Sequence, residues 1–219
     1  MEKDDAILRL GATGASARVI CVLVHGRGQT PEEMEDAIIR HLPGGDVVWL
    51  LPRAPGKEWY AARAIDPLTD ATRAELTASL GLLAACVAQA QEENPGLPLV
   101  LAGFSQGACL SLEYACGGHR APDAFVAFTG CRVGQAGDTR PSAALNGVPV
   151  YLTGADADPW IPVFAVAEAA ASLGLAGARL RLDLFPGRPH EVSAPERVML
   201  ASILSDLAAG RAVTWGAAA

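Results

Sequence analysis

Short apolar strand signals alternate with helical patterns along this chain, and that alternation constrains the fold more than any other feature. Residues 18–24 read RVICVLV, a β-branched apolar run without polar alternation, as is typical of a strand covered on both faces. Further strand signals lie at residues 47–51, 97–102, 123–128, 148–153 and 179–185. The sequence therefore predicts an α/β fold with a mostly parallel central sheet and helices on both of its faces.

The segments between these runs carry helix signals. Thr30 is a suitable N-cap before Pro31, and the longest helix begins at Asp70, with an apolar stripe at helical spacing from residue 76 to residue 87. Further helices are predicted at residues 106–116, 163–173 and 194–208. Because no repeat or shift in composition marks a boundary, we expect one domain over residues 1–219, with 1–5 and 212–219 as candidate flexible termini.

Charge and cysteine content exclude several classes of protein. The formal net charge is −7 and no run of Lys or Arg occurs, which argues against a nucleic-acid partner. The longest apolar stretches are strand-length or interrupted by Gly and polar residues, so no stable membrane insertion is expected, and residues 1–5 are not followed by the apolar core of a secretion signal. Five cysteines without paired spacing indicate reduced thiols in a cytoplasmic protein, not a disulfide framework or a zinc site.

One motif, Gly103-Phe104-Ser105-Gln106-Gly107, lies between a predicted strand and a predicted helix. A serine on a sharp strand-to-helix turn has a crowded backbone, and glycine two places to either side leaves room for the turn. The turn would lift the hydroxyl above the carboxyl edge of the sheet, where open α/β sheets bind ligands. A tight glycine-rich turn with a non-catalytic serine could have the same sequence motif. The predicted strand before the motif and the apolar helix after it favour a nucleophilic Ser105.

A serine nucleophile needs a base, and His190 is the best-placed histidine for that role. It lies just past the last predicted strand and before the last predicted helix, so its loop belongs to the same sheet edge as Ser105. The other histidines fit badly: His41 is at a helix end, His119 is in a helix-terminating stretch, and His25 precedes the nucleophile.

The acid that orients the histidine should follow the penultimate strand, where Asp156 and Asp158 are both candidates. Asp156 also suits an ordinary turn-capping role. The stiff, Pro-bounded stretch 158–162 favours Asp158. Asp183, inside a strand, and Glu191, next to the histidine, are poorer choices.

A glycine-flanked loop, His25-Gly26-Arg27-Gly28, directly follows the first strong strand at the same sheet edge. The backbone N–H groups of Arg27 and Gln106 could therefore form a pair of donors for an oxyanion. Taken alone, the His-Gly-x-Gly pattern is also compatible with a plain turn between strand and helix.

With these residues in view, the chain resembles the phospholipase/carboxylesterase family of α/β-hydrolases, the group that includes the acyl-protein thioesterases. The resemblance covers residues 19–196. It is carried by LVHGRGQTPEEM (23–34), LPRAPGKEWY (51–60), LAGFSQGACLSLEYA (101–115), VYLTGADADPWIP (150–162) and PGRPHEV (186–192).

The resemblance implies the α/β-hydrolase fold, with Ser105 as nucleophile, Asp158 as acid and His190 as base. It selects Asp158 over Asp156, because the family's acid stands four residues before the proline matched by Pro162. It also implies backbone donors from Arg27 and Gln106, an acyl pocket walled by Trp59 and Tyr60, and no metal or organic cofactor. Relatives often pair, so a homodimer is a further expectation.

Three departures from the family pattern lie near the expected substrate site and bear on substrate preference. The loop before the histidine, usually close to Gly-Met-Gly-His, is Gly187-Arg188-Pro189-His190. The stretch after the middle strand, often Ser-Gly-Gly, is Thr129-Gly130-Cys131-Arg132, which makes Cys131 a candidate pocket residue. Trp160, a fourth candidate substrate contact, stands where many relatives carry a small or polar residue.

The sequence therefore predicts a serine hydrolase that cleaves small-molecule carboxylic esters of short to medium acyl chains through an acyl-enzyme intermediate. A thioesterase would use the same site and differ only in the leaving group. A non-catalytic hydrolase-fold binding protein is the alternative from another class, and it is disfavoured because all three triad positions hold chemically competent residues.

Overall fold

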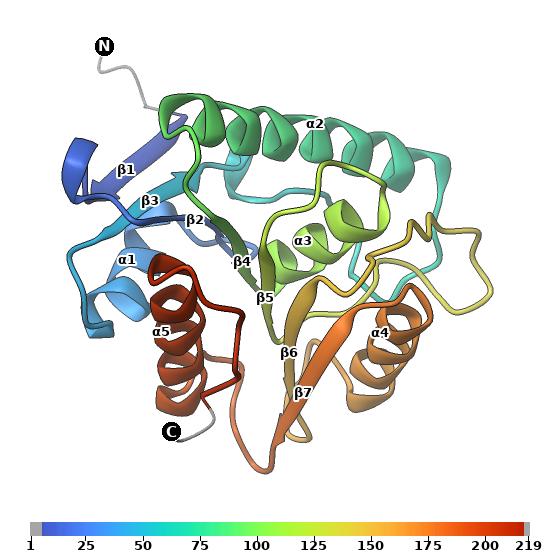
Figure 1. Cartoon of the computed structure of the whole chain (residues 1–219). Coiled ribbons are helices and arrows are strands. Elements are labelled where there is room, and N and C mark those ends of the chain that lie inside the picture. The colour runs from blue at the N-terminus through green and yellow to red at the C-terminus, as the bar shows by residue number, and fades with distance from the viewer. Residues whose placement is uncertain (1–5, 217–219) are drawn as a thin grey trace.

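The computed structural model describes residues 6–216, and its centre is a seven-stranded sheet in the order β1-β3-β2-β4-β5-β6-β7 (Figure 1). The strands are β1 (Ile7–Gly11), β2 (Val19–Val24), β3 (Val47–Pro52), β4 (Leu99–Phe104), β5 (Ala124–Phe128), β6 (Pro149–Ala155) and β7 (Arg179–Phe185). β1 pairs antiparallel with β3 at one edge, and every other pairing is parallel. The predicted mostly parallel α/β sheet is confirmed.

Helices cover both faces of the sheet (Figure 1). They are α1 (Pro31–Ala37), α2 (Asp70–Glu93), α3 (Gln106–Cys116), α4 (Val163–Leu175) and α5 (Ala194–Ala208), with short 3-10 turns at Gly14–Ser16, Ile39–His41 and Pro55–Lys57. The apolar side chains of α2, α3 and α4 join one core cluster, and those of α1 and α5 join the other. Three layers result, with the sheet in the middle.

Strand β2 shows why its sequence is apolar at every position. Ile20 and Val22 belong to the core cluster on one face, whereas Cys21 and Leu23 belong to the cluster on the other face, and all four are fully buried. Successive side chains of a strand point to opposite faces, so a strand covered by helices on both sides has no solvent-facing position for a polar residue.

Helix starts follow the predicted capping chemistry. Thr30 caps α1, because its hydroxyl accepts a hydrogen bond from the Glu33 amide while the Glu33 carboxylate accepts one from the Thr30 amide. Ser193 and Glu196 form the same reciprocal pair at the start of α5. The second pair has consequences for the site, because it lies next to the loop that carries His190.

Strand β1 is the element that the sequence pattern did not predict. It is a five-residue edge strand whose burial is only partial, so it lacks the continuous apolar run of the inner strands. The predicted terminal segments lie partly outside the described residues, namely 1–5 and 217–219. Within 212–216, Val213 is buried and the Thr214 amide donates to the Asp206 carboxylate at 2.8 Å, so this part is fixed to the domain.

Among the described helices, only α2 is long and apolar enough by length and composition to cross a membrane. Its buried side chains, which include Leu76, Leu83 and Val87, pack into the core cluster on one face of the sheet. The apolar character of α2 is therefore explained by its packing against the sheet. Length and composition alone are weak evidence for a membrane span.

Candidate active site

Ser105 occupies a tight turn between β4 and α3, with φ 54° and ψ −120°. A positive φ is unfavourable for a residue with a side chain, and such strain concentrates at functional sites. The two glycines of the motif allow the turn by close approach. A Cβ on Gly103 would lie 2.5 Å from the Gly107 carbonyl, and a Cβ on Gly107 would lie 2.2 Å from the carbonyl oxygen of Val24.

The structure brings the three predicted site residues together. His190 lies in the loop between β7 and α5, and Asp158 lies in the loop between β6 and α4. The Nε2 atom of His190 is 2.8 Å from the Oγ atom of Ser105, and its Nδ1 atom is 2.6 Å from the Oδ2 atom of Asp158. These contacts form one continuous chain of hydrogen bonds from carboxylate to imidazole to hydroxyl.

The hydrogen bonds of Asp158 favour one tautomer of the His190 imidazole. Its side chain is fully buried, and its Oδ1 atom accepts hydrogen bonds from the amides of Trp160 at 2.8 Å and Ile161 at 2.9 Å. The carboxylate accepts the Nδ1–H of His190 through its other oxygen, which leaves Nε2 to accept the hydroxyl proton of Ser105. The imidazole ring also packs against Phe104, with ring centroids 4.9 Å apart.

The competing candidates lie elsewhere. Asp156 accepts a hydrogen bond from the Gly187 amide at 2.6 Å, and so joins the loop after β6 to the loop that carries the histidine. His25 is buried, with Nδ1 2.8 Å from the Gly26 carbonyl and Nε2 accepting from the Ala54 amide at 3.0 Å. Burial lowers the pKa of His25, which favours the neutral ring that this pair of contacts requires.

The two predicted oxyanion donors flank the nucleophile. Arg27 and Gln106 line the same pocket as Ser105 and His190. Gln106 is the first residue of α3, so its amide belongs to the positive end of a helix. The adjacent amides of Gly26 and Gly28 are engaged by the Gln29 side chain and the Lys57 carbonyl. Among the described residues, the backbone amides of Arg27 and Gln106 have no hydrogen-bond partner.

The pocket beside Ser105 has a volume of about 440 Å³. It is lined by Arg27, Tyr60, Arg63, Ala64, Ser105, Gln106, Cys109, Trp160, Ile161 and His190. Two predicted substrate contacts, Tyr60 and Trp160, are among them, and Trp160 is 59% exposed at the rim.

The other two predicted substrate contacts do not line this pocket. Trp59 is buried, and its indole N–H donates to the His25 carbonyl at 2.9 Å. Cys131 is fully buried, with its sulfur 3.9 Å from that of Cys109. Cys109 reaches the pocket instead because it lies one helical turn after Ser105 on α3, a spacing that could have identified it.

Side chains of the two predicted oxyanion donors also hold the pocket wall, which sequence reasoning missed. The guanidinium of Arg27 donates to Glu58 at 2.7 Å and to the carbonyls of residues 60, 61 and 62. The side-chain Oε1 atom of Gln106 accepts from the backbone amide of Trp59 at 2.9 Å, and its Nε2 atom donates to the Tyr60 carbonyl at 2.7 Å. Both residues therefore fix the segment 58–62 against the nucleophile turn.

Within residues 6–216, no group of three or more His, Cys, Asp or Glu side chains is arranged to hold a metal ion. The hydrogen-bonded chain ending at Ser105 offers a nucleophile with its own base, and the amides beside it offer fixed donors for a negatively charged oxygen. This arrangement is suited to attack on a carbonyl group.

Comparisons with known proteins show what the whole chain resembles. A phospholipase/carboxylesterase from Dyadobacter fermentans is 28% identical, with a TM-score of 0.80, covering 91% of this chain and 95% of that one. Esterase PE8 is 24% identical, with a TM-score of 0.71 and coverages of 91% and 97%. Acyl-protein thioesterase 2 from Zea mays is 16% identical, with a TM-score of 0.74 and coverages of 92% and 98%. The last two likenesses concern the fold.

No curated protein sequence matches the chain significantly. The model of one protein family, Phospholipase/Carboxylesterase, matches residues 9–207, which is nearly the whole chain. This match and the Dyadobacter likeness support a serine hydrolase of the esterase or thioesterase type. The chain belongs to the phospholipase/carboxylesterase family of α/β-hydrolases.

Proposed function

We propose that this protein is a carboxylesterase in which Ser105 is the nucleophile, His190 the general base and acid, and Asp158 the residue that orients the histidine. One observation carries the proposal: the unbroken hydrogen-bonded chain in which His190 is 2.6 Å from Asp158 and 2.8 Å from Ser105. A serine hydroxyl is a weak nucleophile until a neighbouring base accepts its proton, and this contact supplies that base.

The reaction proceeds in two acyl transfers. The Oγ atom of Ser105 attacks the ester carbonyl carbon while the Nε2 atom of His190 takes the hydroxyl proton. The resulting imidazolium gives this proton to the leaving alkoxide, so that an alcohol departs and an acyl-serine remains. Water then attacks the acyl group, with His190 again taking and returning a proton, and the carboxylic acid is released.

Negative charge that develops on the carbonyl oxygen is stabilised by the backbone N–H groups of Arg27 and Gln106. Fixed donors of this kind need no reorganisation when the charge appears, which makes them effective in a site that is partly closed to water. The hydrogen bonds of the neighbouring Gly26 and Gly28 amides support this assignment, because among the described residues they leave the Arg27 amide as the one without a partner in this stretch, and Arg27 lines the pocket.

Acyl groups of short to medium length are the proposed substrates. The volume of about 440 Å³ lies toward the lower end of the range of small-molecule sites, which is about 300–1,000 Å³. Tyr60, Ile161 and Trp160 supply apolar surface for the acyl chain. A thioester would meet the same nucleophile and donors and would differ only in its leaving thiol.

Two measurements on the wild-type protein and the Ser105→Ala variant test the proposal. Wild type is expected to react with a fluorophosphonate, which labels only activated serines, and to hydrolyse p-nitrophenyl esters with highest kcat/KM at short or medium chain length. The variant is expected to do neither. Absence of both activities in wild type would refute the enzymatic proposal and favour a binding protein. Matched oxygen and thio esters then rank the two leaving groups.

We also propose a cytoplasmic location. All five cysteines are buried free thiols, as expected where disulfides do not form. The expected homodimer remains a prediction, and light scattering coupled to size-exclusion chromatography would measure the mass of the assembly.

A further inference from the structure

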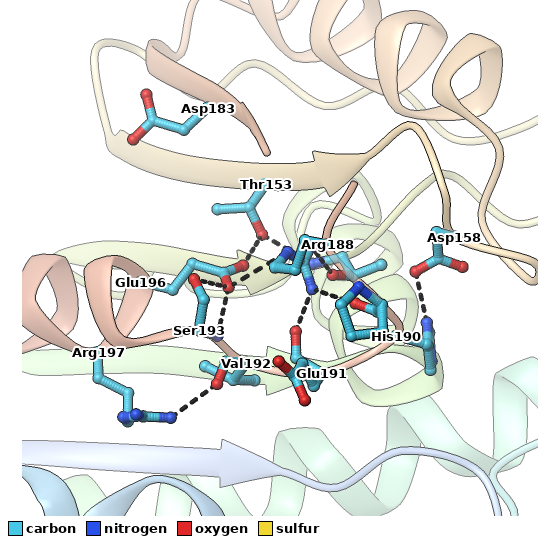
Figure 2. Close-up of polar contacts among 12 residues, drawn as sticks. Thr153, Asp158, Asp183, Arg188, His190, Glu191, Val192, Ser193, Glu196 and Arg197 are labelled. Carbon is cyan, nitrogen blue, oxygen red and sulfur yellow. Dashed lines mark hydrogen bonds and ion pairs between the residues drawn. The ribbon is translucent and has the colours of Figure 1, made fainter. Parts of the chain in front are cut away.

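The loop that carries His190 is held by a buried arginine two residues before it. Arg188 is 6% exposed, and its Nη2 atom donates to the Thr129 hydroxyl at 2.7 Å. Its Nη1 atom donates to the carbonyl of Pro189 at 3.1 Å and also to the carbonyl of Glu191. The two carbonyls lie on either side of His190 in the chain, so one guanidinium group holds the backbone before and after the histidine (Figure 2).

A buried carboxylate completes this arrangement. Glu196 has no exposed surface, and its Oε2 atom lies 3.7 Å from the Nε atom of Arg188. The same oxygen accepts from the amide and hydroxyl of Ser193 at 2.7 and 2.6 Å, while Oε1 accepts from the Thr153 hydroxyl at 2.5 Å (Figure 2). Glu196 therefore links the start of α5 to strand β6.

The network is closed through the sheet. The Thr153 hydroxyl accepts from the amide of Thr129, the residue that receives Arg188, at 2.9 Å. Thr129 follows β5 immediately, with φ 54°, and the carbonyl of the preceding residue, Phe128, accepts from the amide of Ser105 at 3.0 Å. The histidine loop and the nucleophile turn are thus both hydrogen-bonded to the end of β5, the first through Thr129 and the second through Phe128.

A buried ion pair is a poor way to stabilise a fold, because removing two charges from water costs about as much as their attraction returns. Its value lies in geometry: the planar guanidinium can meet three acceptors and one carboxylate only when the loop has a single conformation. His190 must lie within hydrogen-bond reach of Ser105 for proton transfer, and misplacement by about 1 Å can cost roughly 100-fold in rate.

We propose that Arg188, compensated by Glu196, is a positioning residue that holds the imidazole of His190 at the distance from Ser105 that proton transfer requires. This inference rests on the proposed function of the triad. Arg188 itself does not line the pocket, so its loss should impair the chemical step and leave substrate binding unaltered.

The test is the double variant R188M/E196Q, which removes both charges together and leaves neither one buried without its partner. We expect kcat for a p-nitrophenyl ester to fall about 10- to 100-fold, with KM within about 2-fold of wild type. The rate of fluorophosphonate labelling of Ser105 should fall by the same factor, because labelling also needs the base. Circular dichroism at the assay temperature establishes that the variant is folded.

A matched control is another buried pair, in which the Nε atom of Arg132 is 2.7 Å from the Oε1 atom of Glu113, and neither residue lines the pocket. R132M/E113Q removes a buried pair of the same kind away from the pocket, so its kcat should stay within about 3-fold of wild type. Unchanged kcat in folded R188M/E196Q, or equal loss in both pair variants, would overturn the positioning role. An inactive wild type would instead refute the proposed function.

Two single variants keep the proposal testable if the double variant does not fold. Thr129→Val removes only the hydroxyl that accepts from Arg188, and we expect a smaller fall in kcat, about 3- to 10-fold, at constant KM. R188K keeps the charge opposite Glu196 without the planar fork, so its kcat should also fall below that of wild type at constant KM. A rise in KM with constant kcat in either variant would contradict the proposal.

Discussion

Ser105 and His190 are separated by 85 residues of sequence, yet the hydroxyl oxygen of one lies 2.8 Å from the ring nitrogen of the other. The parallel sheet produces this encounter. Ser105 follows β4, the acid follows β6 and the histidine follows β7, and these strands run in the same direction in the order β4-β5-β6-β7. Their carboxyl ends therefore meet at one edge, where open α/β sheets bind ligands.

Replacement of Asp158 by asparagine should separate the orientation of the base from the nucleophile itself. An asparagine at residue 158 has one carbonyl oxygen and one NH2 group, so it cannot accept from the backbone amides with one atom and from His190 with the other. It therefore favours the wrong tautomer of His190 and does not stabilise the imidazolium. We expect kcat to fall about 10⁴-fold, the size of effect known for the corresponding change in serine proteases, with KM little changed. Steady-state kinetics on a p-nitrophenyl ester measures both constants.

The matched control is Asp156→Asn. Asp156 accepts from the Gly187 amide and does not contact the imidazole, and its asparagine variant keeps an oxygen acceptor for that bond. Its kcat should stay within about 3-fold of wild type. An equal fall in both variants would mean that the loop geometry, and not the carboxylate at residue 158, sets the rate.

Gly107, the second residue after Ser105, should be indispensable for stability. A Cβ at residue 107 would lie 2.2 Å from the Val24 carbonyl oxygen and 2.6 Å from that of His25, and backbone atoms cannot move aside as a side-chain end can. We expect Gly107→Ala to lower the free energy of unfolding by at least about 3 kcal/mol or to prevent folding. Urea unfolding measures the change.

Gly81, within α2, provides the comparison. A Cβ there meets nothing within 4 Å, so Gly81→Ala should raise the free energy of unfolding by about 0.5–1 kcal/mol, as expected in a helix interior. If Gly107→Ala unfolded at the same urea concentration as wild type, the close packing of the nucleophile turn against the end of β2 would be contradicted.

Trp160 should determine the preference for acyl length. Its side chain lines the pocket yet is 59% exposed, so a longer acyl chain can cover it and remove apolar surface from water. Trp160→Ala should raise KM for p-nitrophenyl octanoate about 5-fold, which corresponds to roughly 1 kcal/mol of lost burial, and leave the acetate almost unaffected. Phe164, which is 69% exposed but does not line the pocket, is the control, because Phe164→Ala should change neither value.

Much of this architecture could be predicted from the sequence because local signals agree with the fold. The run at residues 18–24 is apolar at every position because β2 is buried on both faces, and the glycines around Ser105 are required by contacts below 3 Å. The edge strand Ile7–Gly11 lacks such a continuous apolar run. Its partner is β3, and pairing at a sheet edge depends on that distant neighbour more than on its own composition.

The residues whose place in the site depends on strand order could be predicted from the sequence. The contacts that depend on side-chain packing could not. Ser105, Asp158 and His190 follow strands, so topology alone brings their loops together. Trp59 was expected at the pocket wall, but it does not line the pocket, and its buried indole donates to the His25 carbonyl. The Arg188 network joins residues 129, 153, 188 and 196, and no local pattern predicts a contact that depends on two loops, a strand and a helix at once.

His25 should make the protein less stable in mild acid. Burial lowers its pKa in the folded state below the usual value of about 6.5, so the unfolded chain binds the proton more readily. Between the two pKa values the unfolded state carries more protons, and the free energy of unfolding therefore falls as pH is lowered from about 6.5 toward the folded pKa, by up to about 1.4 kcal/mol per pH unit. His25→Gln does not titrate and can still accept from the Ala54 amide, so its urea midpoint should vary less between pH 7.5 and 5 than that of wild type.

The exposed His41 is the comparison, and His41→Gln should keep the full pH dependence. If wild type and His25→Gln lost stability in parallel over this range, protonation of His25 could not be the cause.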